Sequence, residues 1–254
     1  MSIGKYHYNY IKSFMKNCLS DIEIINGVPK VVFIFWFSHK DYIPTFTVRR
    51  FNALKSLIEN INVPVIIITN ENYKNWILEE FPLNENFNNL SGVHKSDYLR
   101  VYLLYHYGGG YHDIKWREKS WENEWDKFQN KNIWFIGRRE IKESHIAYNP
   151  NTDNKNIQKR YNDMITFGWI ISKPKNECLK LFIIRIEEIL NNKSEALKLN
   201  PAPKSRCGIG VDCDESKYPV RWLELLCEIF HPLMLNYIDH INYTLPDIVY
   251  KNYK

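Results

Sequence analysis

Two apolar runs separated by an amphipathic segment set the pattern of the first part of the chain. Residues 31–37 and 64–70 are apolar, β-branched and aromatic over the length of a strand, which is typical of parallel strands buried on both faces. Between them, residues 45–60 carry apolar side chains at helical spacing, with Phe51 and Leu54 among them. This strand, helix, strand order predicts an α/β domain with a mostly parallel, Rossmann-like central sheet.

The same reading extends to the rest of the chain. It predicts further helices at 73–80, 93–107, 177–190 and 221–230 and further strands at 111–116, 133–137 and 164–172. Polar stretches predict loops at 84–89, 140–163 and 191–218. The residues of the helix at 177–190 expected to face the core are Leu181, Ile184, Ile186 and Ile189. No repeat and no linker interrupts the pattern, so we expect one domain over residues 1–254, completed by helices and loops over residues 181–254.

Composition excludes several classes of protein. A hydrophobic share of 44% and a charged share of 25% in 254 residues are those of a globular protein, which excludes disordered, collagen-like and coiled-coil chains. The net charge of +5 comes without a long basic run, which argues against a duplex-DNA binder and is compatible with a phosphate-bearing ligand. Aromatic residues make up 15% of the chain, enough both to fill a core and to stack on ligand rings.

Cysteine usage and hydropathy bear on the compartment. The five cysteines include no CxxC pair, so neither a zinc knuckle nor a disulfide framework is indicated, and a reducing compartment is expected. No apolar stretch has the length of a membrane span, and the first residues contain no signal-type apolar region. We therefore expect a cytoplasmic protein with at most peripheral membrane contact, and the abundance of Asn, Lys and Ile favours a bacterial or viral origin.

The candidate chemistry gathers around a glycine triplet. Three of only ten glycines stand together at 108–110, between a predicted helix and a predicted strand. They either end the helix at positive φ or, at Gly109 and Gly110, let the backbone approach a ligand closely. Asp97 and Arg100 share one face of the preceding helix, as a surface ion pair or as groups directed at a ligand beyond the strand ends.

These residues carry a family resemblance. The run HKSDYLRVYLLYHYGGGYHDIKW resembles the SDxxR, helix, GGxYxDxD core of retaining glycosyltransferases with a DXD-containing sugar-binding region. That family includes capsular polysaccharide synthesis enzymes, initiating α-1,6-mannosyltransferases and, distantly, clostridial glucosylating toxins. The segment GVPKVVFIFW from Gly27 is similar to the family's first strand, and ISKP before Lys175 to its later strand and turn, so the resemblance covers residues 27–180.

The resemblance implies roles for individual residues. Trp36 would stack on the nucleotide base, a contact typically worth about 1–3 kcal/mol. Asp97 and Arg100 would hold hydroxyls of the donor sugar, and Asp113 would face the ribose and the metal-bound diphosphate. The family's fold implies a single GT-A-like, nucleotide-sugar-binding domain. An ordinary core position remains the alternative for Trp36.

The chain departs from the family where the DXD motif should end. Lys115 replaces the second carboxylate, and an ammonium cannot coordinate Mn²⁺ or Mg²⁺. Either Asp113, the diphosphate and a later residue hold the metal, or Lys115 neutralises the diphosphate, or activity is lost. Alternation along the predicted strand would place Lys115 on the face of Asp113. The second DxD-like match, Asp212-Cys213-Asp214, reads as a solvated turn, and Asp239 with His240 is more typical of a surface position than of a metal ligand.

Taken with the resemblance, these features predict a glycosyltransferase. We expect a hexosyl- or N-acetylhexosaminyltransferase that moves a sugar from a UDP-sugar, or alternatively a GDP-sugar, to a glycan or glycoprotein acceptor. The resemblance implies retention of configuration, and residues 140–163 and 191–218 are the expected lids and acceptor surfaces. Two alternatives remain open. One is a nucleotide-sugar-binding pseudoenzyme, which Lys115 would explain, and the other is a basic RNA-binding protein with stacking aromatics.

Overall fold

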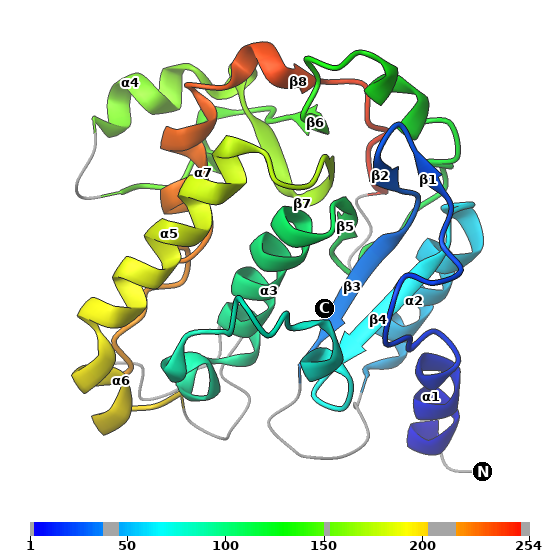
Figure 1. Ribbon diagram of the computed structural model, residues 1–254, viewed down its shortest axis with the longest axis horizontal. Coiled ribbons are helices and arrows are strands. Elements are labelled where there is room, and N and C mark those ends of the chain that lie inside the picture. The colour runs from blue at the N-terminus through cyan, green and yellow to red at the C-terminus, as the bar shows by residue number, and fades with distance from the viewer. Residues whose placement is uncertain (1–2, 38–45, 150–152, 203–216, 250–254) are drawn as a thin grey trace.

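A mixed six-stranded sheet forms the centre of the computed structural model, which describes residues 3–37, 46–149, 153–202 and 217–249 (Figure 1). In the part of the chain described, the strand order is β4-β3-β5-β7-β6-β8. The strands are β4 (Val65–Thr69), β3 (Val32–Trp36), β5 (Gly109–His112), β7 (Ile165–Ser172), β6 (Phe135–Arg139) and β8 (Ile241–Asn242). Strand β3 is parallel to β4 and β5, and β6 is parallel to β8, whereas β7 runs antiparallel to both β5 and β6. The predicted α/β fold with a mostly parallel, Rossmann-like sheet is confirmed.

The first half of the sheet is built by two crossover helices. Helix α2 (Val48–Asn60) connects β3 to β4, and helix α3 (Gly92–His106) leads into β5. Both begin at residues that accept a backbone hydrogen bond, since Thr47 accepts from Arg50 N and Ser91 accepts from His94 N. These elements lie where the apolar periodicity predicts them.

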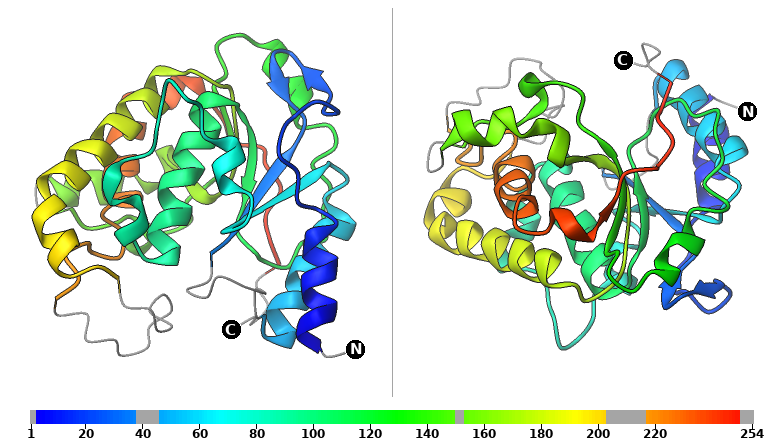
Figure 2. Two further views of the ribbon diagram at one scale, coloured as in Figure 1. Left: turned by 60° about the horizontal axis from the view of Figure 1, so that its bottom comes forward. Right: turned by 90° about the horizontal axis from the view of Figure 1, so that it is seen from above.

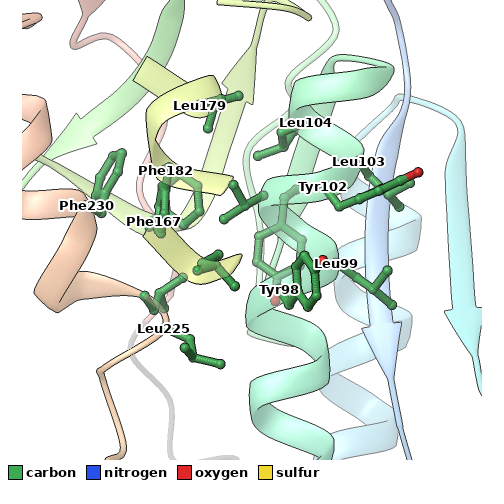
Figure 3. Close-up of a cluster of buried hydrophobic side chains, with 14 of the residues drawn as sticks. Tyr98, Leu99, Tyr102, Leu103, Leu104, Phe167, Leu179, Phe182, Leu225 and Phe230 are labelled. Atoms are coloured by element: carbon green, nitrogen blue, oxygen red, sulfur yellow. The ribbon is translucent and has the colours of Figure 1, made fainter. Parts of the chain in front are cut away.

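Two helical layers enclose the sheet (Figure 2). Helices α3, α5 (Glu177–Asn192) and α7 (Cys227–Met234) cover one face, where Phe33 and Phe35 of β3 join the core. Figure 3 shows part of that core, with α3, β7, α5 and α7 meeting around Phe167 and Phe182. The other face carries Val32 and other alternate β3 residues against α1 (Ile3–Lys12) and α2. Strand β3 is thus buried on both faces, as its continuous apolar run predicts.

Shorter elements complete the described chain. They are β1 (Ile24–Ile25), β2 (Val28–Pro29), α4 (Asn154–Lys159), α6 (Ser194–Leu199) and the 3₁₀ helices η1 (Tyr73–Trp76), η2 (Glu85–Asn89), η3 (Trp125–Gln129), η4 (Glu143–His145), η5 (Tyr161–Asp163) and η6 (Ile238–His240). No helix in the described ranges is both long enough and apolar enough to cross a bilayer.

Several predicted elements are shorter or displaced. The helix predicted at 73–80 is a single 3₁₀ turn, because Asn72 and Trp76 turn inward to bond the carbonyl oxygens of Ile67 and Lys16. The polar stretches predicted as loops contain η2, α4 and α6 among other short helices. The last helix starts six residues later than the pattern predicts, at Cys227.

The buried face of α5 also differs from the expected one. The side chains that pack inward are Cys178, Leu179, Phe182, Ile186 and Leu190, whereas Ile184 is 40% exposed. The helix has more apolar positions than its buried face can hold, and Phe182 anchors it by packing against Phe167 and Phe230. Aromatic volume therefore selects the stripe that faces the core.

The glycine triplet ends α3 and begins β5. Gly108 has φ +74°, and a Cβ there would lie 2.6 Å from Pro174 Cδ. Gly109 has φ +92°, and Gly110 donates a 2.7 Å hydrogen bond to Val31 O while its α-carbon lies against Val32 and Trp121. The strand therefore starts at Gly109 and stops at His112, instead of running from 111 to 116.

Candidate active site

The carboxyl ends of parallel strands meet at one edge of the sheet. Trp36 ends β3, Asp113 follows β5, and Glu140 follows β6, which runs in the same direction as β5 because both are antiparallel to β7. Open α/β sheets bind ligands at this edge. The sequence-predicted residues Asp97, Arg100 and Asp113 come together here.

Arg100 is the centre of a buried hydrogen-bond network. Its Nη1 donates to the carbonyl oxygen of Phe167 at 2.9 Å, and its Nη2 donates to Asp97 Oδ1 at 3.2 Å and to the Tyr111 hydroxyl at 2.9 Å. The guanidinium also lies 4.0 Å from the centre of the Tyr111 ring. Asp97 and Arg100 are only 3% and 5% exposed, so this is an internal ion pair and not the surface pair that their spacing also allowed.

Asp113 carries the network to the surface. The Tyr111 hydroxyl donates to Asp113 Oδ1 at 2.7 Å, and Arg100 Nη2 lies 3.5 Å from the same oxygen. The Asp113 amide donates to Gly168 O at 2.7 Å, which fixes the backbone. Its side chain is 34% exposed, in contrast to the buried Asp97 and Arg100 beneath it. Asp113 is therefore the member of the network that a ligand can reach.

Burial controls the electrostatics of this network. Burial raises the pKa of Asp97 to about 7; Arg100 opposes that shift and Asp113 adds to it. Burial alone would lower the pKa of Arg100, but Tyr111, Asp113 and Asp97 together raise it, so the guanidinium is a permanent cation. One buried positive charge thus faces two carboxyl groups, and the exposed one is Asp113.

An irregularity in β7 shapes the wall next to Asp113. Gly137 pairs with Ile170 while Arg139 pairs with Ile165, so β7 contains extra residues between these two pairs. Within this bulge the carbonyl of Phe167 accepts from Arg100, and the next carbonyl, of Gly168, accepts from the Asp113 amide. A Cβ at Gly168 would lie 3.2 Å from Asp113 Oδ2, so the glycine keeps space open beside that oxygen. Bulges commonly redirect groups in this way at functional sites.

A second buried pair supports the backbone of Asp113. His112 Nδ1 donates to the carbonyl oxygen of Asp113, while its Nε2 accepts from Arg117 Nε at 2.9 Å. Burial, followed by Arg117, lowers the pKa of His112 well below its usual value. The imidazole is therefore neutral, and this histidine is structural.

Trp36 lies apart from the Arg100 network. Its indole stacks on Phe46 with ring centres 4.3 Å apart, and the Arg50 guanidinium lies 4.9 Å from the ring centre. It packs with the core on the α1–α2 face of the sheet, whereas Arg100 comes from α3 on the other face. Gly109 and Gly110 lie inside the sheet and contact the chain around Val31. Trp36, Gly109 and Gly110 thus make contacts with other residues of the protein.

The strand's early end changes the argument for Lys115. Since β5 stops at His112, strict alternation no longer places Lys115 on the face of Asp113. Lys115 is half-buried, and its charge contributes to lowering the pKa of His112 after burial and Arg117.

The described side chains do not build a divalent metal site by themselves. Within these ranges no three His, Cys, Asp or Glu side chains are grouped as metal ligands. Asp113 Oδ1 is already held by Tyr111 beside the Arg100 guanidinium, which leaves Oδ2 as the one open carboxylate oxygen. The Asp212-Cys213-Asp214 match lies outside the described residues. Asp239 and His240 lie beside Trp134, which precedes β6, at the opposite edge of the sheet.

Four contributors to the site were not predicted from the sequence. Phe167 acts through a backbone carbonyl, Gly168 through the absence of a side chain, and Cys227 packs its thiol among the site charges. Tyr111 also received no role, although it stands in the GGxY part of the motif.

The chain also matches a described family. The family model of the capsular polysaccharide synthesis protein matches residues 3–177, which include β3, α3, β5, β7 and every residue of the Arg100 network. No curated protein matches the chain. Because the match spans more than half of the 254 residues, the chain belongs to the capsular polysaccharide synthesis protein family.

Proposed function

We propose that this protein is a glycosyltransferase that moves a hexosyl or N-acetylhexosaminyl group from a UDP-sugar, or alternatively a GDP-sugar, to a hydroxyl of a glycan or glycoprotein. Membership of the capsular polysaccharide synthesis family supports a role in building polysaccharide. The observation that carries the proposal is the one-third exposed Asp113, held at the carboxyl edge over the buried Arg100.

Within this proposal the buried residues position Asp113. Asp97 and Arg100 are too deeply buried to meet a sugar directly in this conformation, so they act through Tyr111 and Asp113. A carboxylate held in this way accepts hydrogen bonds from ribose or sugar hydroxyls without rearrangement, which is how preorganised groups accelerate transfer. Trp36 would take the base after its ring turns away from Phe46 or Arg50.

The reaction needs compensation for the charge of the leaving diphosphate. Bond breaking at the anomeric carbon develops positive charge on the sugar and negative charge on the diphosphate. Lys115, two residues after Asp113, supplies a cation that stabilises phosphate as a point charge. Asp113 Oδ2 is the oxygen of this network that would hold Mn²⁺ or Mg²⁺ together with the diphosphate. We propose retention of configuration, with the acceptor arriving on the face that the diphosphate leaves.

Donor binding tests the proposal directly. Thermal unfolding should be followed with UDP-glucose, UDP-galactose, UDP-N-acetylglucosamine and GDP-mannose. A donor at 100 times its dissociation constant adds about 2.7 kcal/mol to the free energy of unfolding. Asp113→Asn should remove that stabilisation, whereas Asp126→Asn, an exposed carboxyl on η3, should keep it. Absence of a shift with all four donors in the wild-type protein would overturn the proposal.

A binding protein without turnover is the second candidate. It is favoured by one observation, namely that the position of the second DXD carboxylate is Lys115. The two candidates differ in release of UDP or GDP from the donor that binds. Release by the wild-type protein supports the transferase, and binding without release supports the pseudoenzyme.

A further inference from the structure

A histidine and a glutamate form a pair at the end of β6. Glu140 follows Arg139, the last residue of the strand, and its Oε2 lies 2.9 Å from His145 Nδ1. Glu140 is 8% exposed, whereas the His145 side chain is 34% exposed. The carboxylate thus holds the imidazole by Nδ1, and among the hydrogen bonds of the described residues none involves His145 Nε2.

The pair shares the edge of the sheet with Asp113. Strand β7 lies between β5 and β6. Asp113 and Glu140 follow these two outer strands, which are two strand spacings, or about 10 Å, apart across the sheet. Thr166 of β7 bonds Glu140 through its side chain, and its hydroxyl also accepts from the Gly168 amide, next to Asp113 Oδ2. The bulge of β7 therefore lies between the two carboxylates and contacts both.

The surroundings of the Cys227 thiol include both groups. Burial raises the pKa of Cys227 to about 12; among the charges that act on it, Asp97, Glu140 and Asp113 add to the rise and Arg100 opposes it. Glu140 therefore lies within electrostatic reach of the same thiol as the Asp97, Arg100 and Asp113 network. The two residues thus follow strands that lie about 10 Å apart, a spacing that leaves room for a sugar ring.

We propose that His145, oriented by Glu140, takes the proton from the hydroxyl that attacks the donor sugar. This assignment rests on the proposed function. The oxygen of the acceptor hydroxyl, or of water, forms a bond to the anomeric carbon as the bond from that carbon to the diphosphate oxygen breaks. The diphosphate leaves with the bonding pair, and the hydroxyl proton passes to His145 Nε2. Glu140 stabilises the imidazolium that results, as a carboxylate does for an imidazole base in other enzymes.

The charges around the pair come from three elements. Glu140 faces His145 on η4, Arg138 on β6 and the Thr166 hydroxyl on β7. Arg138 is itself paired with Asp247 at 2.8 Å. Burial raises the pKa of Glu140, and His145, Arg138 and Thr166 oppose part of that shift. His145 is thus the catalytic residue of the pair, and Glu140 is a positioning residue.

The first test measures UDP release with water as the attacking hydroxyl. The probe is whichever of UDP-glucose, UDP-galactose and UDP-N-acetylglucosamine the wild-type protein hydrolyses fastest. If it hydrolyses none of the three, GDP release from GDP-mannose is measured instead. His145→Ala should lower release by about 100-fold or more, the usual size of acid–base catalysis, without changing the affinity for UDP. Added imidazole should restore part of the rate. His106→Gln is the matched control, because it alters an imidazole at the C-terminal end of α3, and it should keep the wild-type rate.

The second test separates proton transfer from a purely structural role of Glu140. Glu140→Gln removes the carboxylate that holds the imidazole by Nδ1, so the maximum rate of UDP release should fall while the affinity for UDP stays unchanged. Glu140→Asp should recover part of the rate. Circular dichroism and thermal unfolding establish which variants are folded. If the Glu140 variants do not fold, imidazole rescue of His145→Ala still tests the role of His145.

The outcomes are distinguishable. Equal UDP release by His145→Ala and wild type overturns the assignment and leaves the proposed function intact. A lower rate that imidazole does not restore, with no recovery of the rate in folded Glu140→Asp, also overturns it, because the pair then only shapes the edge of the sheet. If the wild-type protein releases neither UDP nor GDP from any of the four donors, the proposed transferase function fails, and this inference fails with it.

Discussion

The difference between Asp97 and Asp113 shows how burial assigns roles to similar side chains. Both carboxyl groups lie next to Arg100, but Asp97 is 3% exposed and the Asp113 side chain is 34% exposed. The first stabilises the buried cation, and the second presents an oxygen to solvent. Sequence spacing alone places both near the guanidinium and cannot show which of them is accessible.

Asp97 should make the stability of the protein depend on pH. Its pKa rises from 3.8 to about 7 on folding, so the folded state binds its proton more tightly than the unfolded state. The stabilisation is complete below pH 4 and is lost as the pH rises from 4 to 7. Asp97→Asn cannot lose a proton, so its free energy of unfolding should rise relative to wild type over that window, by a few kcal/mol at most, since one pKa unit is about 1.4 kcal/mol.

Urea unfolding of both proteins at several pH values between 4 and 8 measures this difference. Asp126→Asn, which changes an exposed carboxyl, provides the control and should show a flat difference. A flat difference for Asp97→Asn as well would mean that the Asp97 carboxyl ionises normally in the folded protein.

Gly168→Ala should impair activity more than stability. Its Cβ would lie 3.2 Å from Asp113 Oδ2, so the carboxylate must move by a few tenths of an ångström. We expect a loss of about tenfold in donor affinity or UDP release, equivalent to about 1.4 kcal/mol, with unfolding little changed. Gly137→Ala is the matched comparison, because its Cβ would meet Ile165 at 2.6 Å inside the sheet and should cost about 1–3 kcal/mol of stability. Equal effects of the two variants on stability would contradict this assignment.

Lys115 should determine how far activity depends on metal. A lysine stabilises a diphosphate as a point charge but cannot coordinate a cation. We expect partial UDP release in the presence of EDTA, and a stronger dependence on Mn²⁺ in Lys115→Asp, which restores the carboxylate of the DXD pattern. Complete loss of wild-type release in EDTA, with recovery by Mn²⁺, would show that Lys115 does not take over the neutralisation.

At the scale of elements, apolar runs predicted the sheet well. Strands β3 and β4 and helices α2 and α3 lie within two or three residues of their predicted ranges, because burial on both faces or along one stripe leaves a clear apolar period. The predictions failed where hydrogen bonds from Asn and Trp side chains determine the local structure, as at Asn72 and Trp76. Such hydrogen bonds leave no periodic pattern of apolar residues in the sequence.

The candidate site was only partly predictable for the same reason. Asp97, Arg100 and Asp113 come together as their motif spacing predicts. The bulge in β7 that presents the Phe167 carbonyl leaves no trace in the hydrophobic pattern, since its residues alternate like those of an ordinary strand. His145 lies in a polar segment that was predicted to be a loop, where one histidine carries no signal of its own.

The turn between α3 and β5 should be intolerant of side chains. Gly108→Ala combines a left-handed backbone, worth about 1–2 kcal/mol, with a contact of 2.6 Å to Pro174 Cδ. We expect a total loss of about 2–4 kcal/mol in the free energy of unfolding. Gly27→Ala separates the two causes, because Gly27 has φ +80° and open space around it, so it should lose the backbone contribution alone. Equal losses in the two variants would remove the Pro174 contact from the explanation.

At the scale of the whole molecule, the last described segment is tied to the loop that carries Asp113. Arg117 is fully buried and donates to Pro246 O at 3.2 Å and to Lys119 O at 3.1 Å, in addition to His112. Val249 donates a backbone hydrogen bond to Trp116 O. Residues more than a hundred positions apart therefore support one loop at the site, and the Arg117 guanidinium bonds both the distant segment and its own loop.

Arg117→Met should uncouple these two segments while leaving the rest of the fold in place. Methionine fills much of the volume but donates no hydrogen bonds, so two part-buried carbonyls and the buried His112 Nε2 lose their partner, at a cost of about 3 kcal/mol. Amide exchange should quicken in residues 243–249 and 113–117, with α3 and β3 unchanged, and UDP release should fall because the Asp113 carbonyl is held through His112. Arg117→Lys should exchange at an intermediate rate, since it keeps a charge but not the three directed donors. Uniformly faster exchange across the whole chain would instead show that Arg117 stabilises the fold as a unit and has no special connection to the site.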